Sequence, residues 1–291
     1  TRAAMELASD GPLVFVAGDF ADAEACEELM RLAKAAHGVD ADEVLWDDRT
    51  FDLPTWPDGQ LSPLEPLLAR IDELCGVERR EDEQPPCVRF LGPRRGGAPP
   101  PEGATPKRLL PAGLHVDTAG SPYRFLTAML YLADVPQPAG DGATVFPLAS
   151  LPASAETGVH AALPAGGTPD QERLVVAARA SGEALLQGNK LHTVSCTDAA
   201  SRAHKQALVD AAESFCGLSV WPKAGQLLLF FTLTSSGMVD PLSWHTGAGV
   251  QARAGAANGK WYLQVFKTVP PEHRGPGALA RYVSARRSLL R

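Results

Sequence analysis

The amino-acid sequence predicts an α+β fold in which a helical N-terminal region supports a roll of two β-sheets. Amphipathic helical patterns fall within the first 90 residues, whereas short apolar runs rich in β-branched or aromatic residues dominate from residue 113 onward. Short strands separated by long insertions are typical of a two-sheet roll or barrel. We therefore expect a single domain over 1–291, with a helical support region at 1–90 and a roll at 113–269 that carries an insert at 149–216.

The N-terminal region contains two helical patterns, each accompanied by a strand pattern. Residues 21–36 place alanine and leucine at helical spacing, and Asp19 or Asp22 can cap this helix. Residues 62–77 form the second helical pattern and end near Gly76. The strand patterns are GPLVFVAGDF at 11–20 and PPCVRFLG at 85–92. A Pro/Gly-rich segment at 92–112 follows, which we expect to form a surface loop or lid.

The second half of the chain supplies the strands of the roll. Each apolar run is bounded on at least one side by Gly, Pro or Asp, as strands commonly are. The insert between the second and third runs is rich in alanine, and AHKQALVDAAESF within it has a helical pattern. The runs are FLTAMLYLADV at 125–135, GATVFPL at 142–148, LSVWP at 218–222, QLLLFFTL at 226–233 and KWYLQVFKTV at 260–269.

Charge and composition exclude several classes of protein. A net charge of −7 argues against a general nucleic-acid binder, which usually carries a basic excess. No stretch approaches the roughly 18 uninterrupted apolar residues of a membrane span. The chain begins with Thr1 rather than Met, which is compatible with removal of a signal or anchor segment. If such a segment was removed, we expect the protein in the secretory lumen. The sequence predicts neither compartment nor oligomeric state beyond this. The 5 cysteines form no CxxC pair, and Cys196 and Cys216 can be a disulfide or two free thiols.

One stretch, GLHVDT, points to chemistry. His115 and Asp117 are two residues apart, and side chains at that spacing share one face of a strand, where both can bind one metal ion. Two histidines and one carboxylate on one face are the ligand set of non-heme Fe(II) oxygenases. For the third ligand we favour His245, which follows the buried run at 226–233, over His192 in the insert. A lone H-x-D tripeptide is a weak motif without this context.

The chain also resembles a known family, the prolyl 4-hydroxylase branch of the Fe(II)/2-oxoglutarate-dependent dioxygenases. The resemblance is carried by PLVFVAGDFADAEACEELMRLAK, then by LHVDT with YRFLTAMLYLADV and GDGATVFPLA, and then by GLSVWPKAGQLLLFFTLTSSGMVDPLSWHTGAGV with GKWYLQVFK. These motifs occur in order through most of the chain. The resemblance implies a double-stranded β-helix (jelly-roll) core with N-terminal supporting helices.

The same resemblance implies a reaction and its cofactors. His115, Asp117 and His245 would be catalytic ligands of Fe(II), in agreement with the chemical argument. The co-substrates would be 2-oxoglutarate and O2, with ascorbate as a reductant. Oxidative decarboxylation of 2-oxoglutarate to succinate would then drive hydroxylation of an unactivated C–H bond, as in a procollagen-proline 4-dioxygenase.

Further residues are assigned by the same resemblance. Lys260 would bind the distal carboxylate of 2-oxoglutarate, although it lies fifteen positions after His245, where the family usually has about ten; Arg253 is the rival cation. Thr144 would hydrogen-bond the same carboxylate. Phe90 stands where the family has a tyrosine, so that hydroxyl is missing at this position.

The substrate is less determined. Arg124 matches an arginine near the peptide substrate of the family, whereas Thr268 and Phe266 replace a family histidine and tryptophan. The first hypothesis is a hydroxylase of peptidyl proline, and the alternative is an oxygenase of a free amino acid or other small metabolite. Two hypotheses from other classes are a non-catalytic jelly-roll binding module, which should have lost a ligand, and a zinc hydrolase, which would need a nearby general base such as that of HExxH.

Overall fold

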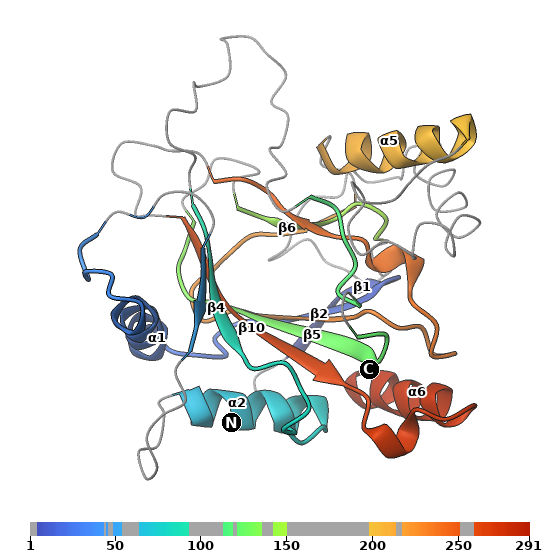
Figure 1. The fold of residues 1–291 in the computed structure, drawn as a ribbon, viewed down its shortest axis with the longest axis horizontal. Coiled ribbons are helices and arrows are strands. Elements are labelled where there is room, and N and C mark those ends of the chain that lie inside the picture. The colour runs from blue at the N-terminus through green and yellow to red at the C-terminus, as the bar shows by residue number, and fades with distance from the viewer. Residues whose placement is uncertain are drawn as a thin grey trace.

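Two antiparallel sheets form the centre of the protein in the computed structural model (Figure 1). The structure describes residues 5–43, 45, 49–53, 64–92, 113–118, 121–135, 142–149, 198–213, 217–250 and 259–291. The large sheet has strand order β1-β2-β8-β5-β10-β4-β3, and the small sheet has order β7-β6-β9. The large-sheet strands are β1 (Met5–Asp10), β2 (Leu13–Ala17), β3 (Arg49–Asp52), β4 (Cys87–Leu91), β5 (Arg124–Tyr131), β8 (Leu227–Phe231) and β10 (Lys260–Thr268). The small-sheet strands are β6 (Thr144–Phe146), β7 (Leu218–Val220) and β9 (Thr246–Gly247).

The large sheet is buried on both faces. Along β5, Leu126, Ala128 and Leu130 belong to the core shared with the helices, whereas Met129 and Tyr131 belong to the core shared with the small sheet. This alternation is the period of two that a pleated strand imposes on its side chains. The small sheet therefore covers one face of the large sheet, and the inner face between them is where a site can be enclosed.

Helices cover the opposite face of the large sheet, and α5 lies on the far side of the small sheet (Figure 1). Helix α1 begins after Asp22, whose side chain accepts a hydrogen bond from the N–H of Ala25 at 2.8 Å, so Asp22 rather than Asp19 is the cap. None of the helices in the described part of the chain has the length and apolar character needed to cross a bilayer. The helices are α1 (Ala23–Ala36), α2 (Leu64–Cys75), α5 (Ala199–Glu213) and α6 (Ala278–Leu290), with short 3-10 turns at Pro241–Ser243 and Pro271–His273.

The α+β class is confirmed, and the two facing antiparallel sheets have the arrangement of a jelly-roll core. Apart from the strand expected at 115–117, the expected helices and strands occur near their sequence positions; most have shorter bounds, whereas α5 begins earlier than its pattern. The single-domain boundaries stay a prediction. Helix α6 was not among the predicted elements. Tyr282 and Val283 of α6 are nevertheless buried, and the arginine at 287 lies over the ring of Phe231 at 5.2 Å.

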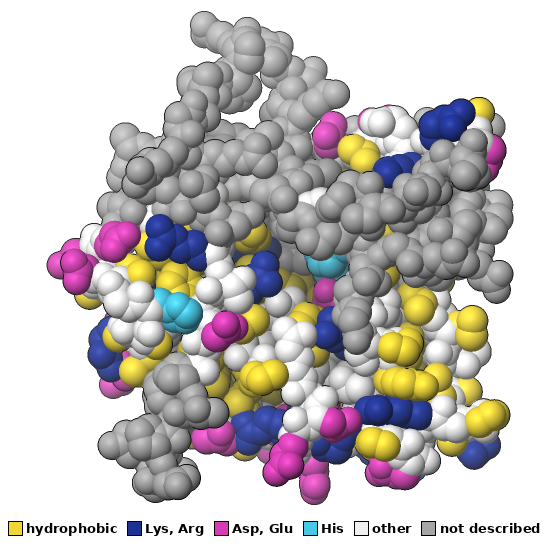
Figure 2. Space-filling view, viewed as in Figure 1, with side chains coloured by type: hydrophobic (Ala, Val, Ile, Leu, Met, Phe, Trp, Pro, Cys, Tyr) yellow, Lys and Arg dark blue, Asp and Glu magenta, His cyan; other side chains and the backbone are white. Residues whose placement is uncertain are grey.

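The surface along α2 and α6 carries charges of both signs (Figure 2). Lysine and arginine side chains alternate there with acidic side chains rather than gathering into a patch of one sign. Ion pairs account for part of this pattern: Arg79 with Glu65 at 2.6 Å, and Arg274 with Asp82 at 2.9 Å. Exposed pairs of this kind contribute little to stability, about 0–1 kcal/mol each.

A tight turn at Gly225, just before β8, is held by main-chain hydrogen bonds. Gly225 donates its N–H to the carbonyl of Tyr131 at 2.9 Å, and its own carbonyl accepts from the N–H groups of Phe20 and Ala21. Its φ of +76° lies in the left-handed region, and a Cβ at this position would lie 2.1 Å from the carbonyl oxygen of Ala21. The turn therefore needs glycine for its conformation and for the close approach.

We predict that Gly225→Ala destabilises the protein by more than about 3 kcal/mol, since backbone strain and a clash with main-chain atoms add. Gly38→Ala is the matched control, because Gly38 also has positive φ but nothing lies within 4 Å of its added Cβ. The control should cost only about 1 kcal/mol. Denaturant unfolding of both variants checks this, and equal losses of unfolding free energy would contradict it.

Candidate metal centre

A backbone bridge places two histidines side by side. The N–H of His115 donates to the carbonyl of His245 at 3.0 Å, and the N–H of His245 donates to the carbonyl of His115 at 2.9 Å. Directly opposed residues of an antiparallel pair project to the same side of the sheet. The two imidazole rings accordingly lie with their centroids 4.4 Å apart. His245 immediately precedes β9, as expected for a residue at the start of a neighbouring strand.

Both imidazoles are held in one tautomer. Nδ1 of His115 lies 3.0 Å from the carbonyl oxygen of Gly113, and Nδ1 of His245 lies 3.0 Å from that of Ser243. Because a carbonyl oxygen can only accept, each Nδ1 must carry the proton. In the neutral ring Nε2 is then the nitrogen that carries the lone pair, the form in which a histidine binds a metal ion.

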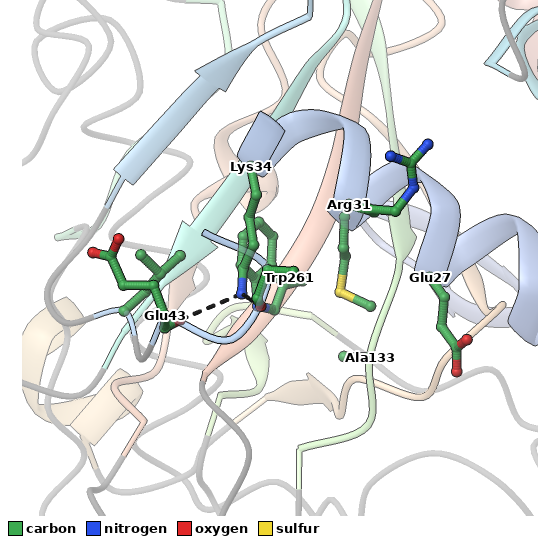
Figure 3. A pocket seen from close by; sticks show the side chains of 9 residues that line it. Glu27, Arg31, Lys34, Glu43, Ala133 and Trp261 are labelled. Atoms are coloured by element: carbon green, nitrogen blue, oxygen red, sulfur yellow. Dashed lines mark hydrogen bonds between the residues drawn. The ribbon is translucent and has the colours of Figure 1, made fainter. Parts of the chain in front are cut away.

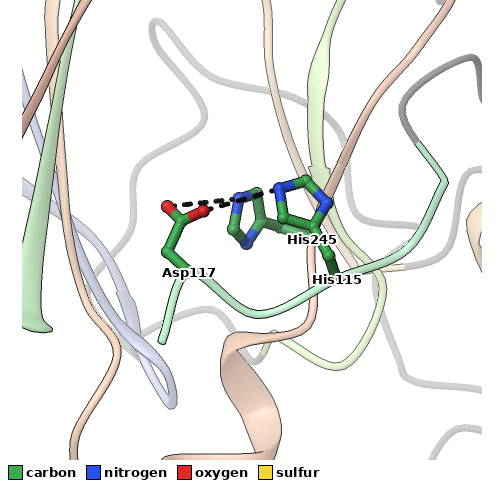
Figure 4. Close-up of side chains that lie close together, drawn as sticks. All are labelled: His115, Asp117 and His245. Atoms are coloured by element: carbon green, nitrogen blue, oxygen red, sulfur yellow. Dashed lines mark ion pairs between the residues drawn. The ribbon is translucent and has the colours of Figure 1, made fainter. Parts of the chain in front are cut away.

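Asp117 faces both Nε2 atoms. Its Oδ1 lies 3.5 Å from Nε2 of His115, and its Oδ2 lies 3.6 Å from Nε2 of His245 (Figure 4). The hydroxyl of Thr127 on β5 donates to Oδ2 at 2.7 Å. The expected strand over residues 115–117 is wrong in detail, because His115 forms only an isolated bridge and the chain turns directly after it. The turn, rather than strand alternation, brings Asp117 to the histidines.

The charge states suit a divalent cation. Burial lowers the pKa of His245 to about 4, so this imidazole is neutral at neutral pH. Burial alone would raise the pKa of Asp117, but His245, His115 and the hydrogen bond from Thr127 outweigh it and hold that pKa well below its usual range. At neutral pH the site therefore presents a neutral His245 imidazole and an ionised Asp117 carboxylate.

These three side chains could hold one metal ion, since one ligand atom from each lies within 4.8 Å of the others. The 3.5 and 3.6 Å separations are close to those of two ligands sharing an ion with bonds of about 2.1 Å. Figure 4 shows the carboxylate of Asp117 turned toward both imidazole rings. Three protein ligands of this kind leave coordination positions on the opposite side of the ion for other molecules.

A buried cation lies on the same inner face. Lys260, at the start of β10, is 0% exposed, and its Nζ donates to Oγ1 of Thr144 at 2.7 Å. The Tyr131 hydroxyl lies 2.8 Å from the same Oγ1. Lys260 has no carboxylate partner among the described residues, and burial lowers its pKa to about 7. An ammonium group enclosed with two hydroxyls and no acid is suited to bind an anion.

We call the group formed by Lys260, Thr144 and Tyr131 the anion pocket. It adjoins the metal centre through β9. A Cβ added to Gly247 would lie 4.0 Å from Nζ of Lys260, so the ammonium group reaches close to this residue. Gly247 is two positions after His245, a distance of about 7 Å along a strand. Lys260 is also one of the groups that lower the pKa of His245.

Phe90 and Tyr131 project to opposite faces of the large sheet. Phe90 faces the helices and packs on Trp261, with ring centroids 4.8 Å apart. Tyr131 projects instead from β5 into the pocket beside Thr144. Sequence reasoning missed Tyr131 because it lies within an apolar run that resembles core. Its spacing of two and four residues from Met129 and Thr127 places all three on one face of the strand, and this could have indicated a polar group on the inner face.

Arg124 lies beside the metal centre. Its guanidinium group donates to the carbonyl of Asp117 at 2.5 Å and to Oε1 of Gln84 at 2.8 Å, and it lies over the ring of Phe266 at 3.6 Å. Arg124 is buried, with 8% of its surface exposed. Thr268, further along β10, donates its N–H to Glu83. A role for Arg124 in binding substrate stays a prediction.

Several sequence candidates lie outside the described residues. These are His192 and Arg253, which were the rivals of His245 and Lys260, together with Cys196 and Cys216 and most of the segments 92–112 and 149–216. Cys26, Cys75 and Cys87 are buried free thiols. The described part of the insert includes α5, as its helical pattern predicted.

A separate hollow of about 260 Å³ lies between α1 and Trp261 (Figure 3). It is on the helix side of β10, because Trp261 packs with the helices and Lys260 faces the other way. Its two cations are already engaged: Arg31 pairs with Glu28 at 2.6 Å, and Lys34 donates to the carbonyl of Ala41 at 2.6 Å. This hollow is therefore distinct from the metal centre and offers no comparable anion site.

Comparisons with known proteins give distant structural likenesses. No protein-family model and no curated protein matches the chain. A viral collagen prolyl hydroxylase from Paramecium bursaria Chlorella virus-1, solved with 2OG, is 12% identical over 90% of this chain and 99% of its own, with a TM-score of 0.42. A Pseudomonas putida prolyl-4-hydroxylase is 13% identical over 88% and 93%, with a TM-score of 0.36. The non-heme iron oxygenase OrfP, solved with Fe, succinate and (3S)-hydroxy-L-Arg, is 16% identical over 88% and 84%, with a TM-score of 0.35. Likenesses at this level assign no activity to this chain.

We predict that Thr127→Val weakens binding of a divalent metal ion about 10- to 100-fold, because the variant keeps the side-chain shape but no longer orients Asp117. Thr127→Ser keeps the hydroxyl and should restore most of the affinity. Equilibrium dialysis against Mn(II) measures both, with circular dichroism as the check on folding. Equal affinities for valine and serine would show that this hydroxyl does not position the ligand.

Proposed function

We propose that the protein is an Fe(II)- and 2-oxoglutarate-dependent dioxygenase that hydroxylates an unactivated C–H bond. The observation that carries this proposal is the combination, on one inner face, of the His115, Asp117 and His245 cluster with an anion pocket centred on Lys260. A metal centre alone would fit several reactions. A buried lysine without a carboxylate partner among the described residues favours an acidic ligand as well.

The donor set fits Fe(II). Two neutral imidazoles and one carboxylate are the ligands of non-heme Fe(II) oxygenases, and they leave positions for other molecules. When bound, iron and 2-oxoglutarate supply the redox chemistry, in which O2 is consumed and 2-oxoglutarate is converted to succinate and CO2. The chain's own contribution is to fix the tautomers of His115 and His245, to orient Asp117 and to exclude water.

The anion pocket fits the distal carboxylate of 2-oxoglutarate. Nζ of Lys260 provides charge, and the hydroxyls of Thr144 and Tyr131 provide hydrogen bonds. Burial raises the pKa of Tyr131, so its hydroxyl stays protonated and can donate. Gly247 leaves the space beside Nζ that a side chain would narrow.

For the substrate we propose peptidyl proline first, with a free amino acid as the alternative. The support for proline is the sequence resemblance, and the support for the alternative is the pair of replacements Phe266 and Thr268. A panel of proline-containing peptides and free amino acids, scored by succinate release, separates the two. Ascorbate is expected to sustain turnover as a reductant.

Anaerobic addition of Fe(II) and 2-oxoglutarate tests the class. We expect a visible charge-transfer absorption band from the chelated 2-oxo acid, followed by succinate release when O2 is admitted. A zinc hydrolase or a non-catalytic binding module gives no such band. Absence of the band with iron demonstrably bound would refute the proposal.

We predict that His115→Ala and His245→Ala each abolish succinate formation and leave the fold largely intact, because each removes one of the three ligands. His273→Ala is the matched control, since His273 stacks on Tyr282 far from the metal centre in the fold. Succinate release measured on all three variants checks this. Activity like the parent's in either ligand variant would overturn the assignment.

We predict that 2-oxoglutarate binding weakens as pH rises above about 7. Burial lowers the pKa of Lys260 to about 7, so the free protein loses the ammonium charge above that pH, whereas a bound dicarboxylate favours the charged form. Binding must then take up a proton, and affinity should fall by up to about tenfold per pH unit above 7 while staying constant below it.

Titration of 2-oxoglutarate between about pH 6 and pH 9, followed by the absorption band, measures this dependence. Lys260→Ala should raise the 2-oxoglutarate requirement strongly with iron still bound. Lys260→Arg keeps its charge throughout and should give a flat profile. A flat profile for the parent protein would contradict the prediction, and an unchanged requirement in Lys260→Ala would point to Arg253.

A further inference from the structure

Both terminal nitrogens of the Arg124 guanidinium group are engaged by the protein, whereas its buried Nε has no hydrogen-bond partner among the described residues. One terminal nitrogen donates to the carbonyl of Asp117, the other donates to Oε1 of Gln84, and the flat face lies over Phe266. Only 8% of Arg124 is exposed. Because both terminal nitrogens donate within the protein and little of the side chain is exposed, the group is arranged to position Asp117 and Gln84.

Gln84 is oriented by this contact. Arginine has donors and no acceptor, so the amide of Gln84 must turn its oxygen toward Arg124 and its NH2 group away. Gln84 is exposed, and its Nε2 has no hydrogen-bond partner in the described part of the chain. A single guanidinium group separates this amide from the backbone of the metal ligand Asp117. Two N–H donors therefore remain available next to the metal centre.

The backbone on both sides of Gln84 is restrained. Glu83 is buried and accepts hydrogen bonds from the N–H of Thr268 at 3.0 Å and from Nζ of Lys267 at 3.3 Å. Pro85 and Pro86 follow, and a proline restricts the residue before it to extended conformations. Gln84 is thus anchored to β10 and β5, the strands that carry Phe266 and Arg124, and its amide is preorganised.

We propose that Gln84 is a substrate-binding residue whose amide NH2 donates to a carbonyl or carboxylate oxygen of the substrate, with Arg124 as its positioning residue. The inference rests on the proposed function and adds a recognition group to that site. A donor-only group selects an acceptor oxygen, which is present as a backbone carbonyl in a peptide and as a carboxylate in a free amino acid. The side chain sits beside the Asp117 end of the site, away from the Lys260 pocket that would hold the co-substrate.

Two substitutions separate recognition from support. Gln84→Glu keeps an oxygen for Arg124 but has no donor at neutral pH, whereas Gln84→Ala loses both. Gln206→Glu, an exposed glutamine on α5, is the control for the change of charge. Substrate-dependent succinate release is measured in two arms, one with an N-acetylated, C-amidated proline-rich peptide and one with a panel of free L-amino acids.

We expect Gln84→Glu to raise the substrate KM at least tenfold in one arm, while substrate-free succinate release and the iron–2-oxoglutarate band match those of the parent and Gln206→Glu is unchanged. An effect in the peptide arm identifies a backbone carbonyl, and an effect in the amino-acid arm identifies a carboxylate.

Three results would overturn the inference. The first is an equal substrate KM for Gln84→Glu and the parent. This includes the case in which only Gln84→Ala has a raised KM, because Gln84 would then serve only to support Arg124. Another is that no compound in either arm raises succinate release in a parent that turns over 2-oxoglutarate. A parent protein with no band and no succinate defeats the proposed function instead, and this inference falls with it.

Discussion

The pair of backbone hydrogen bonds between His115 and His245 is the constraint on which the site depends. It joins the segment before β5 to the segment before β9, and it sets both imidazoles on one side. A shift of one residue in this pairing would turn one imidazole to the opposite side, because side chains alternate along a strand. The carbonyls that fix the two tautomers come from the same local segments, so placement and proton position follow from one short piece of pairing. Thr127 then ties Asp117 to the large sheet.

The second constraint is electrostatic. A lysine with 0% exposure and no acidic partner among the described residues is costly for a folded protein, because burial disfavours its charged form. The fold keeps it at the inner face, within the pocket formed with Thr144 and Tyr131. By contrast, Lys267 faces the helices and pairs with Asp72 at 2.5 Å and with Glu83. Two buried lysines on one strand thus differ: Lys267 is paired with acidic groups, whereas Lys260 has no acidic partner among the described residues.

Much of the fold followed from periodicity, whereas the finer parts of the site did not. The apolar runs of β5, β8 and β10 were predictable, and Asp22 was one of the two candidate caps, since pattern and local chemistry agree there. His245 was chosen correctly as the neighbour of His115 and Asp117 because it follows a buried strand. Tyr131, Thr127 and Gln84 were not identified. Their contacts depend on register between strands and on loops distant in sequence, which one sequence does not reveal. Helix α6 was missed because its arginine side chains cover apolar surface with their aliphatic stems.

A crystal structure of the protein with Mn(II) and 2-oxoglutarate, using manganese as a stand-in for ferrous iron, tests the central claim most directly. The account predicts one anomalous peak bound by Nε2 of His115, Nε2 of His245 and a carboxylate oxygen of Asp117, with the far carboxylate of 2-oxoglutarate against Nζ of Lys260. Metal at another position, or a dicarboxylate that leaves Lys260 without an anionic partner, would contradict it.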